Sequence, residues 1–249
     1  MERNIPSTTQ VMSALLRADF TTQWRNRRSF ILVLIIPIII LLSLKSAIQR
    51  VGGAFILSEC ITLGLVAIGL MGYTNSIARD REKGIFQRLR VAPIPSWAIM
   101  VSRLSVQLAM IILLTLITYV AGNKYDGITL SPVGYLLTLL IAFVGGSVYL
   151  SLGQVIVGLV KNPESVNSMS RLVYIAFIVV GMFSESGLLG DVTPKIVNWS
   201  PYGTVKHMLA AGMAPETWNQ DATNALLVTL GYTVVFSVIG IRKFQWNNR

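Results

Sequence analysis

The residues best suited to specific chemistry lie in one polar segment, residues 79–91, which separates two long apolar runs and reads RDREKGIFQRLRV. If the segment is one helix, Glu82 falls on its apolar side, because Glu82 precedes Ile85 and Phe86 by three and four residues. A carboxylate in that position is costly unless a basic side chain nearby or a group on another protein pairs with it. The pattern predicts a short helix that docks into a partner protein. The alternative is a solvated loop whose basic residues only fix membrane topology.

Catalytic and metal-binding chemistry is poorly supported elsewhere in the chain. Cys60 is the only cysteine and His207 the only histidine, which excludes an intrachain disulfide and a zinc site built from several Cys and His ligands. No G-x-S-x-G motif is present for a serine nucleophile. We therefore expect no catalytic residues and no metal site, and a membrane enzyme acting on lipid is the least favoured alternative.

The composition is typical of a membrane protein. Hydrophobic residues make up 53% of the 249 positions and charged residues only 13%, whereas soluble domains carry about 25% charged residues. The formal net charge of +10 could indicate nucleic-acid binding. However, the Lys and Arg residues lie between long apolar runs, so we expect no nucleic-acid partner.

The apolar runs predict an all-α membrane protein with six transmembrane helices. Each run is long enough to cross about 30 Å of hydrocarbon at about 1.5 Å per residue. Together they form a predicted six-helix domain over residues 30–241, with spans at about 30–48, 55–77, 97–121, 133–160, 170–189 and 223–241.

The distribution of basic residues predicts the orientation of these spans. Alternating the connecting loops between the two sides places 16 of the 21 Lys and Arg residues on one side. The positive-inside rule makes that side cytoplasmic, so both termini are expected in the cytoplasm and the protein in the cell (inner) membrane. The cytoplasmic segments would be residues 1–29, the loop 78–96 and the tail 242–249.

Two segments outside the spans are expected to be helical. In residues 1–29, Ser7 and Gln10 form a possible capping box before an apolar stripe bordered by arginines, which predicts an amphipathic helix on the inner membrane face. The external segment 185–222 contains several glycines, prolines and interfacial aromatic residues. We expect short re-entrant helices there that dip into the outer leaflet.

Some residues inside the spans have predicted roles of their own. Ala142, Gly146 and Gly153 predict a helix-packing face, within the same subunit rather than at a dimer interface. Glu59 and Glu185 lie near the external ends of their spans, where an ordinary hydrated carboxylate is favoured over a functional one.

The chain resembles the ABC-2 type permeases, the membrane subunits of ATP-binding-cassette exporters, and more closely their drug-type branch. The resemblance covers the six spans, the preceding amphipathic helix, the aromatic-proline stretch of Trp199, Pro201 and Tyr202, and a loop signature between spans two and three. That signature is matched in order and spacing by Glu82, Lys83, Gly84, Leu89 and Pro93. Ala92 departs from it, because the family commonly has Ser or Thr before this proline.

The resemblance implies that the loop helix binds a groove of a separate ATPase subunit. Glu82 would anchor this contact, Phe86 and Leu89 would supply its apolar side, and Arg79, Lys83 and Arg88 would pair with acidic groups. The chain has no G-x-x-x-x-G-K-[ST] motif, so ATP and Mg would be bound by the partner ATPase and no cofactor by this chain.

The family also implies an assembly of two permease subunits, as a homodimer or with a similar permease, embedded in membrane lipid. The substrate would be a lipophilic or amphipathic molecule such as a drug, lipid or natural product. The alternative function is an ion-coupled secondary transporter or a channel that works without an ATPase. It is disfavoured because the predicted spans show neither an internal repeat nor a proton relay.

Overall fold

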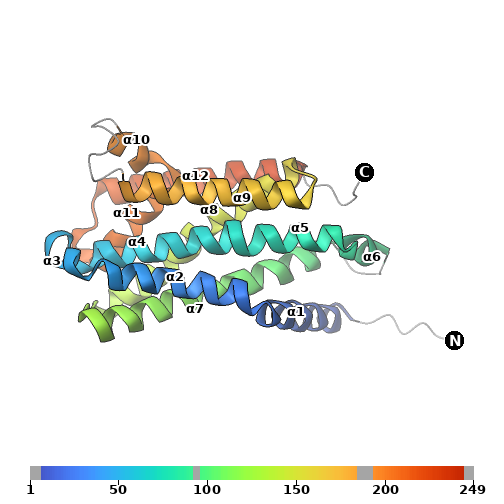
Figure 1. Cartoon of the computed structure of the whole chain (residues 1–249), viewed down its shortest axis with the longest axis horizontal. Helices are drawn as coiled ribbons and strands as arrows, with labels where there is room; N and C mark the ends of the chain where they lie inside the picture. Colours follow the sequence, from blue (N-terminus) through green and yellow to red (C-terminus); the bar gives the residue numbers. More distant parts are fainter. Residues whose placement is uncertain (1–6, 92–95, 184–192, 244–249) are drawn as a thin grey trace.

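The described part of the protein is helical, with no strand among its residues. The computed structural model describes residues 7–91, 96–183 and 193–243, and its long helices run roughly along one common axis (Figure 1). This confirms the predicted all-α class for the described residues. In chain order the helices are α1 (Thr8–Arg25), α2 (Arg27–Ser43), η1 (Lys45–Ala47), α3 (Ile48–Val51), α4 (Gly53–Val66), η2 (Ala67–Tyr73), α5 (Thr74–Glu82), α6 (Ile85–Val91), α7 (Ser96–Asp126), α8 (Pro132–Leu159), α9 (Pro163–Phe183), α10 (Thr193–Trp199), α11 (Pro201–Met213), η4 (Pro215–Thr217) and α12 (Gln220–Lys243).

Several of these helices are suited to crossing a membrane. Four described stretches are long and apolar enough, namely Gly53–Glu82, Trp97–Asp126, Pro132–Leu159 and Gln220–Lys243. A fifth results if Val33–Ser43 and Lys45–Val51, which are bent by 49° relative to each other, are counted as one broken span. The predicted span at residues 170–189 overlaps α9 but extends into residues that the structure does not describe.

The central helix of the bundle is the continuous stretch α4–η2–α5, whose middle section is π-helical. The carbonyl of Gly69 accepts hydrogen bonds from the backbone N–H and the side-chain hydroxyl of Thr74 (Oγ1–O distance 2.8 Å). A Cβ at Gly69 would lie 2.6 Å from the backbone of Tyr149 on α8. The close packing of η2 on α8 therefore leaves no space for a side chain at position 69. The wider π-helical turn lies at this close contact.

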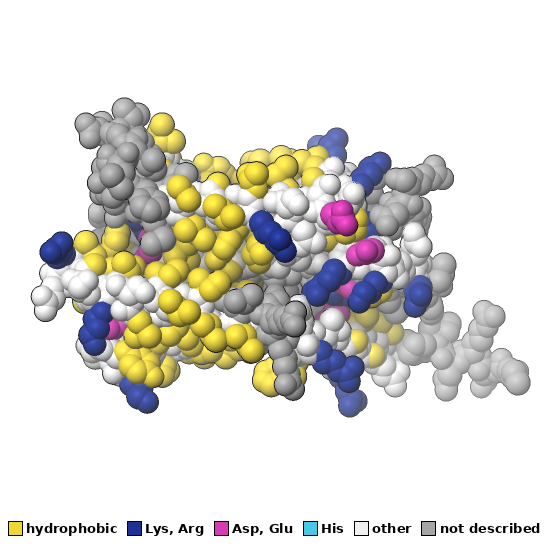
Figure 2. Space-filling model, viewed as in Figure 1, with side chains coloured by type: hydrophobic (Ala, Val, Ile, Leu, Met, Phe, Trp, Pro, Cys, Tyr) yellow, Lys and Arg dark blue, Asp and Glu magenta, His cyan; other side chains and the backbone are white. Residues whose placement is uncertain are grey.

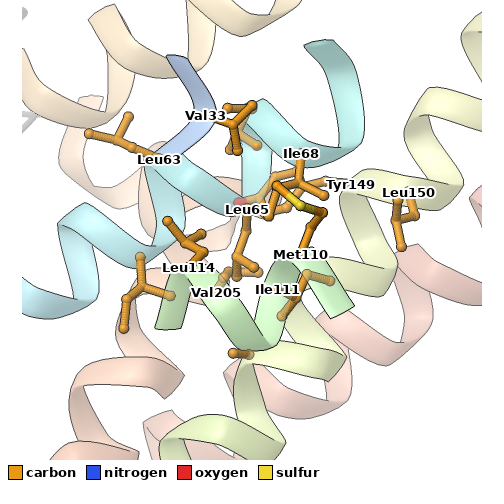
Figure 3. Close-up of a cluster of buried hydrophobic side chains, with 14 of the residues drawn as sticks. Val33, Leu63, Leu65, Ile68, Met110, Ile111, Leu114, Tyr149, Leu150 and Val205 are labelled. Atoms are coloured by element: carbon orange, nitrogen blue, oxygen red, sulfur yellow. The ribbon is translucent and has the colours of Figure 1, made fainter. Parts of the chain in front are cut away.

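The small residues of α8 face other helices of the same chain. Ala142 is fully buried. A Cβ at Gly146 would meet Ile111 of α7, and a Cβ at Gly153 would meet the Thr74 hydroxyl of α5. Figure 3 shows Ile111 within a cluster of buried side chains that also includes Leu65, Tyr149 and Val205. Four helices, α4, α7, α8 and α11, therefore meet in one apolar core.

The two predicted flanking helices are present in the described residues. Helix α1 begins with the expected capping box: the Gln10 N–H donates to the Ser7 hydroxyl at 3.3 Å, and the Ser7 N–H donates to the Gln10 side chain at 3.0 Å. In the segment 185–222, α10 and α11 are short helices, and α11 packs on α4, α8 and α12. Residues 185–192 lie outside the described part.

The charged side chains gather toward the ends of the bundle, and hydrophobic side chains cover much of the face between them (Figure 2). In the views of Figures 1 and 2, the end that carries α5 and α6 is the more densely charged one. Helices α1, α5 and α12 each carry basic residues in their last turn, where a cation interacts favourably with the helix C-terminus.

The close helix crossing gives a first prediction. Gly69→Ala should destabilise the protein by about 1–3 kcal/mol, because the added methyl group meets the Tyr149 backbone, which cannot rotate away. Gly231→Ala is the matched control, since a Cβ there has no atom within 4 Å and alanine favours a helix by up to about 1 kcal/mol over glycine. Thermal unfolding in detergent measures both. Equal shifts in the two variants would contradict the role given to Gly69.

Candidate functional site

The polar segment expected to dock a partner forms two helices. Helix α5 ends at Glu82, and Gly84 then adopts a positive φ of 65°. The Gly84 N–H donates to the Arg81 carbonyl at 3.1 Å, and its own carbonyl accepts from the Arg88 N–H of α6 at 3.2 Å. Glycine is favoured here because a left-handed backbone is costly for residues with a Cβ.

This break corrects one expectation. The sequence pattern predicted Glu82 on the apolar side of a single helix with Ile85 and Phe86. The structure separates them at Gly84, and Glu82 is exposed at the end of α5. Because Glu82 is exposed, its carboxylate does not need a partner to offset a cost of burial. It lies on the surface, where another protein can contact it.

The predicted docking residues that are described lie on the surface of this end of the molecule. Phe86 is the exception, since it is 1% exposed and packs into the core. The side chain of Leu89 and all of Pro93 lie outside the described part. We call the exposed residues of α5, α6 and their connection the α5–α6 surface: Arg79, Glu82, Lys83, Gln87 and Arg88.

Behind this surface, Arg81 joins the end of α5 to the end of α8. Its guanidinium donates to the carbonyls of Val157 and Val160 at 2.8 and 3.1 Å, and the residue is buried. These carbonyls belong to the last turn of α8 and its C-cap, where a helix leaves acceptors unsatisfied and carries partial negative charge. Arg81 therefore satisfies the C-terminus of α8 and fixes α5 against it.

Arg103 joins three helices at the same end. From the second turn of α7 it forms ion pairs with Asp80 of α5 and, at 3.3 Å, with Asp19 of α1. The side chains of all three residues are only 10–11% exposed. Asp19 also accepts a hydrogen bond from the Ser102 hydroxyl at 2.6 Å. One cation is shared by two nearly buried carboxylates, so its loss would remove the counter-charge that both of them contact.

A second ionic cluster lies between α4 and α11. Lys206 of α11 pairs with the Glu59 carboxylate at 3.6 Å, and the Tyr202 hydroxyl donates a hydrogen bond to the same carboxylate. The Lys206 ammonium also lies 4.7 Å from the ring centre of Phe55. Burial, reinforced by the Glu59 charge, raises the pKa of Tyr202, which keeps the phenol protonated as a donor.

This cluster corrects the expectation for Glu59. It is 5% exposed, so it is no ordinary hydrated carboxylate, and the buried charge is paired as a membrane interior requires. Glu185 lies outside the described residues. Of the aromatic-proline stretch, Tyr202 is buried, Pro201 begins α11 and its carbonyl accepts from the Tyr149 hydroxyl at 3.1 Å, and Trp199 is exposed.

Comparison with known proteins identifies the family. The model of the ABC-2 type transporter family matches residues 10–202, which is more than three quarters of the chain. This protein belongs to the ABC-2 type transporter family. Its sequence is also similar to the Bacillus subtilis (strain 168) protein named "Putative transport permease YvfS", with 23% identity over 203 residues that cover 79% of this chain and 80% of that relative.

Membership of the family makes this chain the membrane component of an ABC transporter, a class of permease that normally works with an ATPase subunit. The α5–α6 surface lies inside the matched region. So do Asp19, Asp80 and Arg103, although in the sequence Arg103 indicated only the orientation of a span. The signal for this ion pair in the sequence was that Asp19 and Asp80 are acidic residues within otherwise basic segments. Each of them needs a cation nearby.

The triad around Arg103 gives a second prediction. Arg103→Gln in the permease should cost about 3–5 kcal/mol of stability, because Asp19 and Asp80, whose side chains are nearly buried, lose the cation that pairs with both of them. It should also loosen α1, which limited trypsin digestion within α1 would detect. Arg88→Gln, at an exposed position of the same end, is the control and should change neither property. Unchanged stability and digestion of the Arg103 variant would refute the triad as a structural lock.

The Glu59–Lys206 pair gives a third prediction. Lys206→Met should destabilise the permease by about 3–5 kcal/mol because the buried Glu59 carboxylate loses the ammonium that pairs with it. Adding Glu59→Gln should recover most of this loss, since a neutral amide can still accept the Tyr202 hydrogen bond. A double-mutant cycle on thermal unfolding measures the coupling. Additive effects of the two substitutions would show that the pair contributes no coupling energy.

Proposed function

We propose that this chain is the permease subunit of an ATP-binding-cassette exporter and that the α5–α6 surface docks its ATPase subunit. The observation that carries the proposal is the exposed Glu82, which shares the α5–α6 surface with Lys83 and Arg88, at the end of a helix that continues into the core. Charged groups on such a surface favour a partner of complementary charge pattern. Family membership supports the same role, because these permeases normally work with an ATPase.

The supporting contacts suit a surface that must transmit force. Arg81 fixes α5 to α8, and Arg103 fixes it to α7 and α1. A push on α6 would therefore reach four helices at once rather than bending one loop. Packed elements joined by buried charges move as units, which is how a small local displacement is passed to a distant site.

The proposed topology has six spans with both termini in the cytoplasm of a cell-membrane protein. The broken pair α2–α3, the stretch α4–α5, and α7, α8, α9 and α12 are the six helices, and α9 supplies the span that extends beyond the described residues. The α6 end is then cytoplasmic, in agreement with the basic residues gathered there. Helix α1 would lie on the inner face, and α10–α11 would form the external re-entrant segment of residues 185–222.

The proposed complex contains two permease subunits and two ATPase subunits. ATP and Mg bind to the ATPase, because no P-loop motif occurs in this chain. The substrate route runs between the permeases and carries a lipophilic or amphipathic molecule, such as a drug, a lipid or a natural product, because its walls come from predominantly apolar helices.

A co-purification experiment tests the docking role. Glu82→Lys should abolish recovery of the ATPase subunit with the permease, because it replaces the acidic residue of the α5–α6 surface by a basic one. Glu216→Lys is the matched control: it makes the same chemical change at an exposed residue of η4, beyond the end of α11. It should leave co-purification intact, and both variants should unfold at the temperature of the unmodified protein.

Two outcomes would contradict the proposal. An ATPase that binds Glu82→Lys as well as the unmodified chain would refute docking through this surface. Transport by the purified chain alone in liposomes, without nucleotide, would instead favour an ion-coupled carrier or channel.

A further inference from the structure

A cavity of about 540 Å³ lies on the side of the bundle between α7 and α12, with α8 behind it. Its apolar wall includes Met100, Leu104 and Leu108 of α7, Leu150 of α8 and Ile241 of α12. The volume is within the range of roughly 300–1,000 Å³ found for small-molecule sites. The cavity is separate from the α5–α6 surface and from the Glu59–Lys206 cluster.

Most of the polar side chains in the wall already form hydrogen bonds with one another or with the backbone. The Tyr73 hydroxyl donates to the Gln154 side chain at 2.6 Å, and the Ser147 and Thr233 hydroxyls lie 3.2 Å apart. The Ser151 hydroxyl donates to the Val148 carbonyl at 2.8 Å. Because these bonds are internal, the wall favours an apolar occupant, as apolar protein cavities do.

The cavity is elongated along α7, and one of its ends lies near the charged end of the bundle (Figures 1 and 2). Its lining residues on α7 extend from Trp97 to Leu108, a rise of about 16 Å. Trp97 and Ile241 at the charged end are exposed, with Ile241 72% exposed. Arg242 and Lys243 come directly after Ile241 and are also exposed. An apolar slot that is followed by two cations on the same helix matches a molecule with an apolar chain and an anionic head.

We infer that this cavity binds the hydrocarbon chain of an anionic amphiphile whose head group lies at Arg242 and Lys243. The chain enters from the membrane side and occupies the space between α7 and α12. In the topology given under the proposed function, the bound amphiphile belongs to the cytoplasmic leaflet, and this assignment rests on that topology. Binding itself needs neither that topology nor an ATPase, so its test is independent of the docking experiment.

Photolabelling tests the site directly. The full chain in phosphatidylcholine vesicles is irradiated with palmitate that carries a diazirine in the middle of its chain, and adducts are located by peptide mass spectrometry. Adducts are expected on the lining residues of α7, α8 and α12. Ser237→Phe fills the cavity from α12 and should lower this labelling by about tenfold, the effect of displacing roughly two buried methylenes.

The neighbouring residue offers a matched control. Val238 is exposed and does not line the cavity, so Val238→Phe should label like the unmodified chain. Ser237→Leu, a smaller filling substitution, should give an intermediate loss and guards against misfolding of Ser237→Phe, which thermal unfolding also monitors. Equal labelling of Ser237→Phe and Val238→Phe, or adducts spread over lipid-facing residues such as Leu227 and Val234, would overturn the inference.

The head-group contact has its own comparison. Arg242→Gln should weaken labelling by the charged palmitate probe and leave labelling by the corresponding alcohol unchanged. Lys161→Gln, which removes an exposed charge beyond the end of α8, should affect neither probe. Identical behaviour of the Arg242 and Lys161 variants would refute the anionic head group. Competition by phosphatidylglycerol shows which molecule supplies the hydrocarbon chain. If phosphatidylglycerol displaces the palmitate probe, the site binds a phospholipid chain. If palmitate labelling persists, the site binds a free single-chain amphiphile.

Discussion

The charged end of the molecule depends on one nearly buried cation, Arg103, held between Asp19 and Asp80. Three helices, α1, α5 and α7, each contribute one member, and α1 is separated from the other two by about 50 residues or more. A buried ionic group is weak evidence for added stability, but removal of one member leaves an uncompensated charge. Such a group therefore penalises alternative packings strongly. It fixes the position of α5, which carries part of the α5–α6 surface, relative to α1 and α7.

Composition and periodicity were enough to predict the local features of the fold. Long apolar runs predicted the helices, the Ser7–Gln10 spacing predicted the start of α1, and small residues on α8 predicted close packing. These features depend on residues close together in the chain. The helical wheel was wrong about Glu82 because it assumed a continuous helix, although Gly84 was visible in the sequence as a residue that commonly ends one.

The long-range ionic contacts could not be predicted in the same way. Glu59 and Lys206 are separated by more than half the chain, and Lys206 lies in a segment for which the sequence predicted short re-entrant helices but not the helix against which they pack. Only the packing of α11 against α4 brings them together. Likewise, the sequence indicated Arg81 only as one of several basic residues that predict the membrane topology. Its role depends on the C-terminus of α8, which the fold brings beside it.

The two ionic clusters are attached to one helical unit. Gly53–Glu82 carries Glu59 near one end and Asp80 and Arg81 near the other, about 32 Å apart along a continuous helix. Helices resist compression along their axis, so an axial displacement imposed at α6 arrives at Glu59 largely undiminished unless the π-helical section absorbs it. Lys206 and α11 must then move with Glu59, because breaking the buried pair costs several kcal/mol. In the proposed transporter, α11 would thereby follow a displacement of the α5–α6 surface through the continuous helix and the Glu59–Lys206 pair.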